Sequence, residues 1–437
     1  MKTSSFQIAI TIVCIVGAIV AVGMFSGYIP SGSKAEEAAE KAVTITIWGT
    51  FKRLNIMDVV KTFNAANPLI KLSYTEFVED SLADKLTEAY ANGSGPDLII
   101  IDNENFAEIS KRVTPIPLVS FSDANFRQTF ISEGENFLFT KGVMALPILV
   151  DPMIMYYNKS LFDGAAISAP PVTWEEALSM APLLTKKDAS FNITQSALAL
   201  GSFSNINNAK DILSMILMQY GNPVFVKSNN TIVPVLSSGS QDNTASPAES
   251  ALQFYTGFTD PSKDYYTWSR QELPSRDAFL SEYLVMYFGY ASELPALRKA
   301  NYNLSLDIAK VPQIKDTKTA LTFGHIYGIA VAKSSKKAST AVQAAILLSN
   351  STNALTFAKV FNLPPARRDL LAKPPASPYH LKTFYQSALM SRAFLDTDIN
   401  KTTEVFENMV NKILTNRENI SNVISEANNN LVQVSIK

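Results

Sequence analysis

The chain has 437 residues, which is longer than one compact core supports, so we predict two domains. Its hydrophobic fraction of 47% and charged fraction of 18% are typical of a globular protein and exclude a largely disordered chain. The 38 basic and 39 acidic residues give a net charge of -1, so nothing in the charge balance indicates a nucleic-acid partner. Two histidines and one cysteine leave little material for a metal site and none for a disulfide, so we expect neither metal nor cofactor.

The stretch from residue 6 to 25 is uncharged and about as long as the roughly 20 residues that span a bilayer. A cleaved signal peptide is the alternative, but its apolar region is usually roughly 7–15 residues, and no clear small-x-small cleavage site follows. A lipoprotein signal needs a small residue before its cysteine, where Val13 stands. We therefore expect an uncleaved single-pass transmembrane anchor over 6–28 and a tether over 29–42. With Lys2 inside, the bulk of the chain lies on the extracellular or periplasmic side of the cell membrane.

Strands and helices alternate after the tether. Residues 43–48 (VTITIW) predict a first strand, and residues 69–78 and 97–102 predict the second and third. Apolar residues at helical spacing fill the two intervals between them. This alternation predicts βαβ units and a parallel sheet that is covered on both faces.

The ends of these strands supply the first candidate ligand contacts, because ligands bind beyond the carboxyl ends of strands in such sheets. We expect contacts from a set of residues after the first and third strands: Trp48, Thr50, Phe51, Asn103 and Asn105. Core packing is the alternative for Trp48. One of the polar residues after the third strand, Asp102 included, can instead cap the next helix.

The segment 142–178 carries the most informative pattern. Residues 143–150 read as an apolar strand, which Asp151 interrupts before residues 153–157 resume the apolar pattern. A charge inside a buried stretch costs several kcal/mol unless it is paired or faces a wet cavity, so the pattern predicts a cleft wall or a crossing between two lobes. Further on, Thr173 and Glu176 form a capping box that opens a helix.

The second half of the chain contains longer and less regular patterns. Residues 192–221 predict a helix, and the polar residues 228–247 predict a long loop. The remaining expected elements are strands at 283–290 and 326–331, a helix at 339–348 and a C-terminal amphipathic helix around Phe406.

Several segments occur in a characteristic order: ITIWG, GSGPDLIIID, LPILVD followed by YYNKSLF, PPVTWEEAL, FLSEYLVMYFGY and HIYGIAVAKSS. In this order they resemble the extracellular solute-binding proteins of ABC importers, the maltose-binding-like family 1. The resemblance covers residue 43 to the C-terminus and implies an α/β, two-lobe periplasmic-binding-protein-like fold (type II), preceded here by the expected transmembrane helix. It implies crossings between the lobes near Asp151, Leu321 and Phe361. The lobes would be 43–150 with 321–360, and 151–320 with 361–437.

The resemblance also implies that Asp151 points into a ligand cleft, although it could instead cap a turn or pair with an arginine. His325 lies where the chain of this family crosses between lobes, but a lone histidine is often structural. Tyr290 ends an apolar strand and is a candidate, whereas Tyr287 is more typical of a core.

Three further candidates lie in polar loops of the second half. Trp268 could stack on a sugar ring or anchor a small core, and Arg367 could clamp a ligand oxygen or tie its loop to a lobe. Asn207 belongs to an amide-rich loop that suits hydroxyl recognition and equally suits a solvated turn.

No catalytic motif stands out: G-x-S-x-G, H-E-x-x-H and the phosphate-binding G-x-x-x-x-G-K are all missing. We therefore predict a non-enzymatic, membrane-anchored receptor for a small solute, a sugar or oligosaccharide by analogy, that delivers it to separate ABC permease and ATPase subunits. A sensing or scaffolding surface domain on the same fold is the alternative. A carbohydrate-active enzyme is the third, because paired carboxylates are compatible with the sequence.

Overall fold

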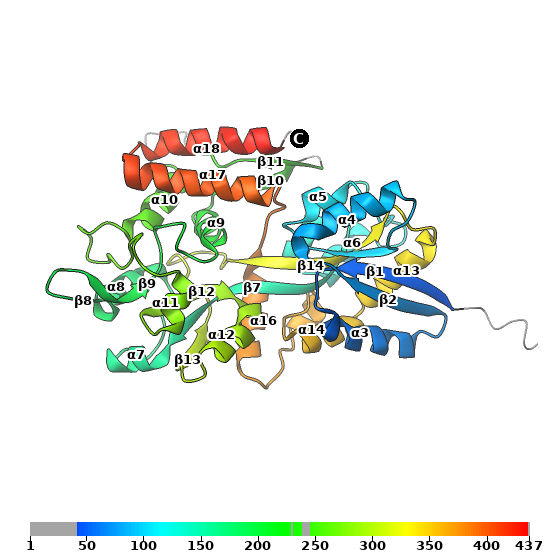
Figure 1. The fold of residues 1–437 in the computed structure, drawn as a ribbon, viewed down its shortest axis with the longest axis horizontal. Coiled ribbons are helices and arrows are strands. Elements are labelled where there is room, and N and C mark those ends of the chain that lie inside the picture. Colours follow the sequence, from blue (N-terminus) through cyan, green and yellow to red (C-terminus); the bar gives the residue numbers. More distant parts are fainter. Residues whose placement is uncertain (1–41, 229, 238–244, 436–437) are drawn as a thin grey trace, which may run out of the picture.

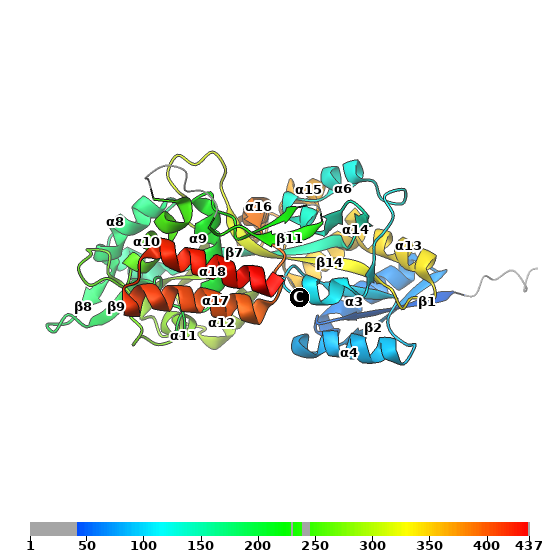
Figure 2. The same cartoon turned by 90° about the horizontal axis from the view of Figure 1, so that it is seen from above.

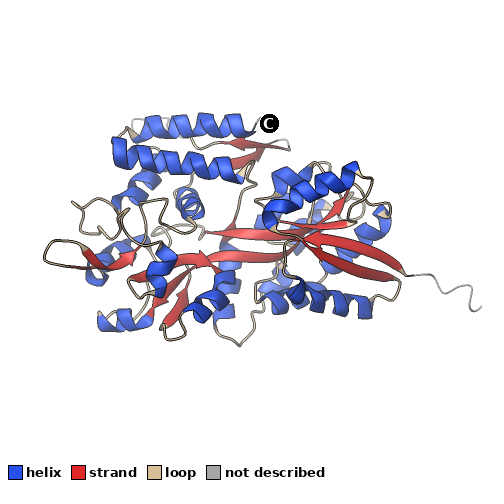
Figure 3. Cartoon of the chain, viewed as in Figure 1, coloured by secondary structure: helices blue, strands red, loops and turns tan. Residues whose placement is uncertain are grey.

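The computed structural model describes residues 42–228, 230–237 and 245–435. They form two α/β lobes that share one continuous sheet, which Figure 3 shows running through the middle of both. Among the described residues, no helix combines the length and the apolar character needed to cross a membrane. The expected anchor at 6–28 lies outside the described residues, as does the expected tether apart from its last residue.

The sheet has eleven strands, and its main path runs β2-β1-β3-β14-β7-β12-β9-β8. In the first lobe, β1 pairs in parallel with β2 and β3, as the βαβ pattern predicts. The strand β3 consists of four buried apolar residues, which fits a position with helices on both faces. The elements of this lobe are β1 (Val43–Gly49), α3 (Arg53–Ala66), β2 (Ile70–Glu76), α4 (Glu79–Ala91), β3 (Leu98–Ile101), α5 (Phe106–Ser110), β4 (Val113–Thr114), α6 (Asp123–Thr129), η1 (Ser132–Phe137), β5 (Leu138–Phe139), β6 (Gly142–Val143), α13 (Ala338–Leu348), α14 (Ser351–Phe361) and α15 (Arg368–Leu371).

The second lobe surrounds the other half of the sheet. Thr173 caps its helix α8 and forms the predicted capping box with Glu176. The elements are α7 (Lys159–Gly164), α8 (Trp174–Leu184), β8 (Lys186–Lys187), β9 (Ile193–Leu198), α9 (Ala209–Gln219), β10 (Phe225–Ser228), β11 (Thr231–Pro234), α10 (Pro247–Gly257), α11 (Ser275–Leu280), β12 (Leu284–Tyr290), η2 (Ala291–Glu293), α12 (Leu294–Ala300), β13 (Leu306–Ala309), α16 (His380–Met390), β15 (Ser391–Arg392), α17 (Ile399–Asn411), η3 (Lys412–Asn416) and α18 (Ile420–Ser435). Figures 1 and 2 both show α17 and α18 side by side along one surface of this lobe.

Two long strands connect the lobes. All thirteen residues of β7 (Leu146–Asn158) are buried, and β7 pairs antiparallel with β14 (Thr322–Ala332). The first half of β7 lies in the first lobe, and its second half pairs with β12 and β13 of the second lobe. Asp151 and His325 lie opposite each other in the register, at the point where both strands pass between the lobes.

Two more segments run through the region between the lobes. After α14, the chain lies against β7, where Val150 N donates to Pro364 O and Ala366 N donates to Ile148 O. After β15, the chain passes Asn103 of the first lobe, whose carbonyl accepts from Asp396 N, and then enters α17.

Two elements differ from those predicted. The segment 192–221 is not one helix, because residues 193–198 form β9, which pairs in parallel with β12, and α9 begins only at Ala209. The polar stretch 228–247 is not all loop, because β11 pairs with β10 in a hairpin. In both cases strand pairing overrides a local sequence of mixed character.

Candidate functional site

A cavity of about 700 Å³ lies between the two lobes. Polar and charged side chains line much of it, together with a few aromatic and aliphatic ones. Its lining residues are Asp102, Glu104, Asp151, Phe203, Ser204, Ile206, Asn208, Ala209, Lys210, Asp211, Tyr290, Ser292, His325, Tyr327, Ile399, Thr403 and Glu407. Both lobes and both crossing strands therefore contribute to one open cleft.

The first lobe presents Glu104 from the turn that follows β3. The carboxylate of Asp102 accepts hydrogen bonds from the backbone N–H groups of Glu104 (2.9 Å) and Asn105 (2.8 Å). Such a side-chain-to-backbone turn fixes the loop locally, as short acidic side chains commonly do. It holds the longer Glu104 side chain toward the cavity.

The second lobe presents Lys210 and Asp211 from the first turn of α9. The N-cap residue of α9, Asn208, has a φ of 59°, a left-handed conformation that asparagine tolerates better than most residues. The Lys210 ammonium lies 2.8 Å from Glu104 Oε1 of the other lobe and 3.2 Å from Asp396 Oδ2. A buried ion pair therefore joins the lobes inside the cavity.

Asp151 and His325 form the middle of the site, on the two crossing strands. Asp151 is only 2% exposed, and its Oδ1 accepts a hydrogen bond from Ser292 N at 3.0 Å. His325 Nδ1 lies 3.6 Å from Glu104 Oε2. The neighbouring position, Gly324, suits glycine, because a Cβ there would overlap the hydroxyl of Ser391.

Aromatic rings form another part of the wall. The Tyr290 ring packs against the His325 ring with a centroid distance of 4.3 Å, and its hydroxyl donates to Asp211 Oδ2 at 2.7 Å. Tyr327 packs against Phe51, which lies behind it at 5.1 Å. Rings supported in this way keep fixed faces, and fixed flat faces suit ring-shaped ligands.

Burial and charge compete in this site. Burial alone would lower the pKa of Lys210, but Asp211, Glu104 and Asp396 outweigh it and raise that pKa, so the ammonium stays charged. Burial also lowers the pKa of His325, and the carboxylates of Glu104 and Asp211 reverse this effect and raise it. For Asp151, burial is the larger effect and raises the pKa to about 6, although the hydrogen bond from Ser292 lowers it.

Three of the predicted site residues line the cavity, namely Asp151, Tyr290 and His325. In the sequence, Asp151 interrupts an apolar stretch, Tyr290 ends one and His325 precedes one. The other eight are not among the lining residues.

Five of these eight lie around the ends of β1 and β3 in the first lobe. Trp48 packs on Phe77, and Phe51 packs between Tyr327 and Phe361. Asn103 is 1% exposed and ties the crossing strand in place, because its Oδ1 accepts from Ile326 N. Asn105 bonds back to Asp102, and Thr50 is half-buried beside the strand end.

The remaining three lie in loops. Trp268 is fully buried, with its indole N–H directed at Asn205 Oδ1, so neither face of the ring is open to a ligand in this structure. Asn207 accepts a hydrogen bond from Arg276 N. Arg367 pairs with Asp369 and donates to Ser349 O, which ties its loop to the lobe.

The sequence reasoning missed Glu104, Lys210 and Asp211. Each lies beside residues that it did single out, since Glu104 stands between two predicted asparagines and Lys210 follows the amide-rich loop. The signal that the sequence offers for Lys210 and Asp211 is a pair of charges at the start of a helix whose remaining residues are largely apolar, and this pattern is too common to single them out.

Comparisons with known proteins identify the family and the fold of this chain. A model of the bacterial extracellular solute-binding protein family matches residues 54–359, which is more than half of the chain. A cyclo/maltodextrin-binding protein complexed with maltotetraose has a TM-score of 0.73 at 15% identity, over 91% of this chain and 98% of that one. The cyclic α-maltosyl-1,6-maltose binding protein of Arthrobacter globiformis also has a TM-score of 0.73, at 16% identity over 90% of this chain and 99% of that one.

A curated relative from Brucella abortus (strain 2308), described as a binding protein, is 31% identical over 149 residues. This match spans 33% of the present chain and 35% of the relative, about a third of each. The structural likenesses establish the two-lobe type II fold, and the family match establishes the kind of protein, which confirms the prediction made from the ordered sequence segments. The chain belongs to the bacterial extracellular solute-binding protein family 1.

Proposed function

We propose that this chain is a receptor that encloses a carbohydrate between its lobes and delivers it to the permease of an ABC importer. The observation that carries the proposal is the cavity between the lobes, because hydrogen-bonding groups and aromatic rings from both sides converge on it. Two of the similar structures are described with malto-oligosaccharide ligands. Sugars need this combination of polar groups for hydroxyls and flat faces for the ring.

Binding would close the lobes about the two crossing strands. A ligand that contacts both lobes stabilises the closed arrangement by its differential affinity for it. Glu104 and Lys210 then act on opposite walls, while Asp151 and His325 lie between them at the crossing. We assign ligand contact to Asp151, Tyr290 and His325, joined by Glu104 and Lys210.

Delivery needs subunits that this chain does not supply, so we propose separate permease and ATPase partners. The anchor over residues 6–28 would hold the receptor at the outer or periplasmic face of the membrane. The sequence predicts lobes of 43–150 with 321–360 and 151–320 with 361–437, and we propose this division with one change. Residues 361–371 belong with the first lobe, because Ala366 N donates to Ile148 O and α15 packs on α6.

A sugar panel tests the proposal. The purified full chain is heated with maltose, maltotriose, maltotetraose, cyclic glucans and mannobiose at millimolar concentration, and the melting temperature is recorded. A true ligand raises it, since binding to the native state adds RT ln(1 + [L]/Kd) of stability. Asp151→Asn should weaken that ligand about tenfold or more while the melting temperature without sugar stays close to that of the wild type. A panel without any shift removes the carbohydrate assignment, and a fold lost in Asp151→Asn assigns Asp151 to the hinge instead.

A further inference from the structure

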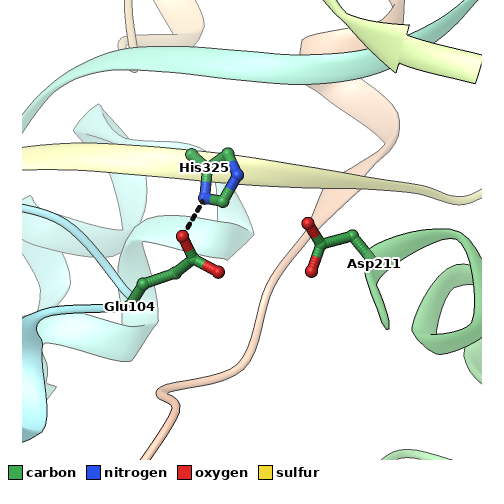
Figure 4. A group of neighbouring side chains, drawn as sticks. All are labelled: Glu104, Asp211 and His325. Carbon is green, nitrogen blue, oxygen red and sulfur yellow. Dashed lines mark ion pairs between the residues drawn. The ribbon is translucent and has the colours of Figure 1, made fainter. Parts of the chain in front are cut away.

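Three potential metal ligands meet in the cavity. One donor atom each from Glu104, Asp211 and His325 lies within 4.8 Å of the other two. Figure 4 shows that the carboxyl groups of Glu104 and Asp211 both face the space beside the His325 ring. The three residues come from the first lobe, the second lobe and the crossing strand β14, respectively.

Each carboxylate uses one oxygen elsewhere and leaves the other toward this space. Glu104 Oε1 faces Lys210, while its Oε2 lies 3.6 Å from His325 Nδ1. Asp211 Oδ2 accepts from the Tyr290 hydroxyl. In metal sites, the carboxylate oxygen that does not bind the metal usually accepts hydrogen bonds from neighbouring groups. These bonds orient the oxygen that does bind the metal.

Asp211 supplies a further observation that points to a ligand. The residue is only 7% exposed, and its Oδ1 is buried without a hydrogen bond to any described residue. The nearest cation, Lys210 Nζ, lies 3.7 Å from that oxygen, which is too long for a hydrogen bond. A buried carboxylate oxygen left in this condition is costly, and a bound cation would remove the cost.

The local charge also leaves room for a divalent ion. Three carboxylates, those of Glu104, Asp211 and Asp396, surround the single ammonium of Lys210. Zinc binding displaces any proton that the ring nitrogen of His325 holds, and without that proton the group carries two negative charges in excess. One doubly charged cation neutralises this excess.

We propose that Glu104, Asp211 and His325 form a divalent-metal site between the lobes, of the zinc class. One imidazole nitrogen with two carboxylate oxygens is a donor set that Zn²⁺ accepts, at roughly 2.0–2.2 Å. A tetrahedral ion at that distance spaces its donors by about 3.4 Å, close to the 3.6 Å between Glu104 Oε2 and His325 Nδ1. The three donor atoms lie within 4.8 Å of one another, so Asp211 completes the site when closure of the lobes brings it nearer by up to about 1.4 Å. Three protein ligands leave the fourth position open to the cavity.

The proposed site can be tested by the melting temperature of the protein with zinc and by the number of zinc ions that it binds. Because its ligands come from both lobes, zinc should favour the closed arrangement and raise the melting temperature. The probe is zinc chloride alone, so the outcome does not depend on whether the solute is a sugar. The full chain, freed of any affinity tag and stripped with EDTA, is dialysed against zinc, and the bound metal is counted by atomic absorption.

We expect one zinc ion per chain. Asp211→Asn and His325→Gln should each lower the zinc affinity at least about 100-fold in competition with a chromogenic chelator. Glu407→Gln is the matched control, because it removes another carboxylate of the same cavity and should change the affinity less than about twofold. Circular dichroism without metal verifies that each variant folds. If one of the two ligand variants does not fold, the zinc affinity of the other is enough to test the site.

Substoichiometric zinc overturns the site. It is equally overturned if zinc binds with wild-type affinity to both ligand variants, which would place the metal elsewhere, for example on Cys14. A loss of affinity in Glu407→Gln as large as in the ligand variants would mean diffuse attraction by an acidic cavity instead of coordination.

Discussion

Two lysines connect the lobes, and their surroundings differ. Lys210 is buried inside the cavity, where its ammonium lies between Glu104, Asp211 and Asp396. Lys227, on the β10–β11 hairpin of the second lobe, is an exposed residue. Its ammonium donates to backbone carbonyls of the first lobe, Leu138 O at 2.6 Å among them, and lies 4.5 Å from the centre of the Phe139 ring.

The two lysines show that the number of contacts a side chain makes differs from its effect on stability. Both side chains make several polar contacts across the lobes, so a contact list would treat them alike. Water can replace the carbonyls around Lys227, whereas the carboxylates around Lys210 would remain buried without their cation. We therefore expect burial, not the number of contacts, to decide how much each lysine stabilises the protein.

Replacing Lys210 should have the largest effect. Lys210→Met keeps the apolar stem of the side chain but removes the ammonium, so three carboxylates remain around an uncharged group. One of these carboxylates, that of Asp396, is only 1% exposed. Breaking a buried ion pair on one side typically costs about 3–5 kcal/mol. Urea unfolding, with EDTA present to exclude metal, should show a loss of that order in the free energy of unfolding.

Lys61 provides the matched control for this experiment. Its side chain is 73% exposed and lies 3.7 Å from Asp58, so it is an ion pair at the surface. Lys61→Met should change the free energy of unfolding by no more than about 0.5 kcal/mol. If Lys210→Met were equally mild, the buried cluster would be unimportant to the fold and the comparison between the two lysines would fail.

Glu133 gives the opposite case, a buried carboxyl for which burial dominates over any neighbouring charge. Burial raises its pKa from 4.5 to about 7, with the Ser391 hydroxyl and the charge of His325 opposing the shift. The folded state therefore holds the proton more tightly than the unfolded state does. The stability that this proton contributes is fully present below about pH 4.5 and is lost as the pH rises to about 7.

Glu133→Gln removes the titrating group and should reveal this loss. Above pH 7 the variant should be more stable than the wild type by on the order of 3 kcal/mol, and the advantage should vanish near pH 4.5. Melting temperatures of both proteins at half-unit pH steps measure the difference. A constant difference across the whole range would show that Glu133 does not titrate in this window.

The parts of the fold that could be predicted are those in which local pattern and final environment agree. The strand Leu98–Ile101 is apolar throughout because helices cover both faces of the sheet, and the capping box at Thr173 is a local event. The strand β9 was missed because ITQSAL mixes polar and helix-compatible residues. Its strand character comes from pairing with β12, which local sequence does not contain.

The site divides in the same way. Asp151 could be found because it interrupts an apolar stretch, and His325 because the family resemblance places a crossing between the lobes there. Glu104 and Lys210 could not, because a charge beside a turn or in the first turn of a helix is typical of an ordinary surface. Only the approach of two segments 106 residues apart gives them a shared role. Trp268 shows the converse, since its polar neighbours in sequence suggest a cleft, while the fold buries it completely.

Removing Lys227 should have the smallest effect on stability. Lys227→Met gives up hydrogen bonds that water can largely replace, so we expect a loss of about 1 kcal/mol or less in the free energy of unfolding. Its effect should appear instead in the arrangement of the lobes, because the hairpin then contacts the first lobe chiefly through Asn230 and Thr140. Small-angle X-ray scattering should record a larger radius of gyration for the variant without ligand.

Lys187→Met is the control for this last comparison. Lys187 is also exposed and lies 4.8 Å from the centre of the Tyr266 ring, but both residues belong to the second lobe. Its replacement should leave the radius of gyration unchanged. If Lys227→Met lost nearly as much free energy of unfolding as Lys210→Met, the argument from burial would be contradicted. A wider separation of the lobes at nearly unchanged stability would show that an exposed lysine can set the spacing of the lobes without stabilising the fold.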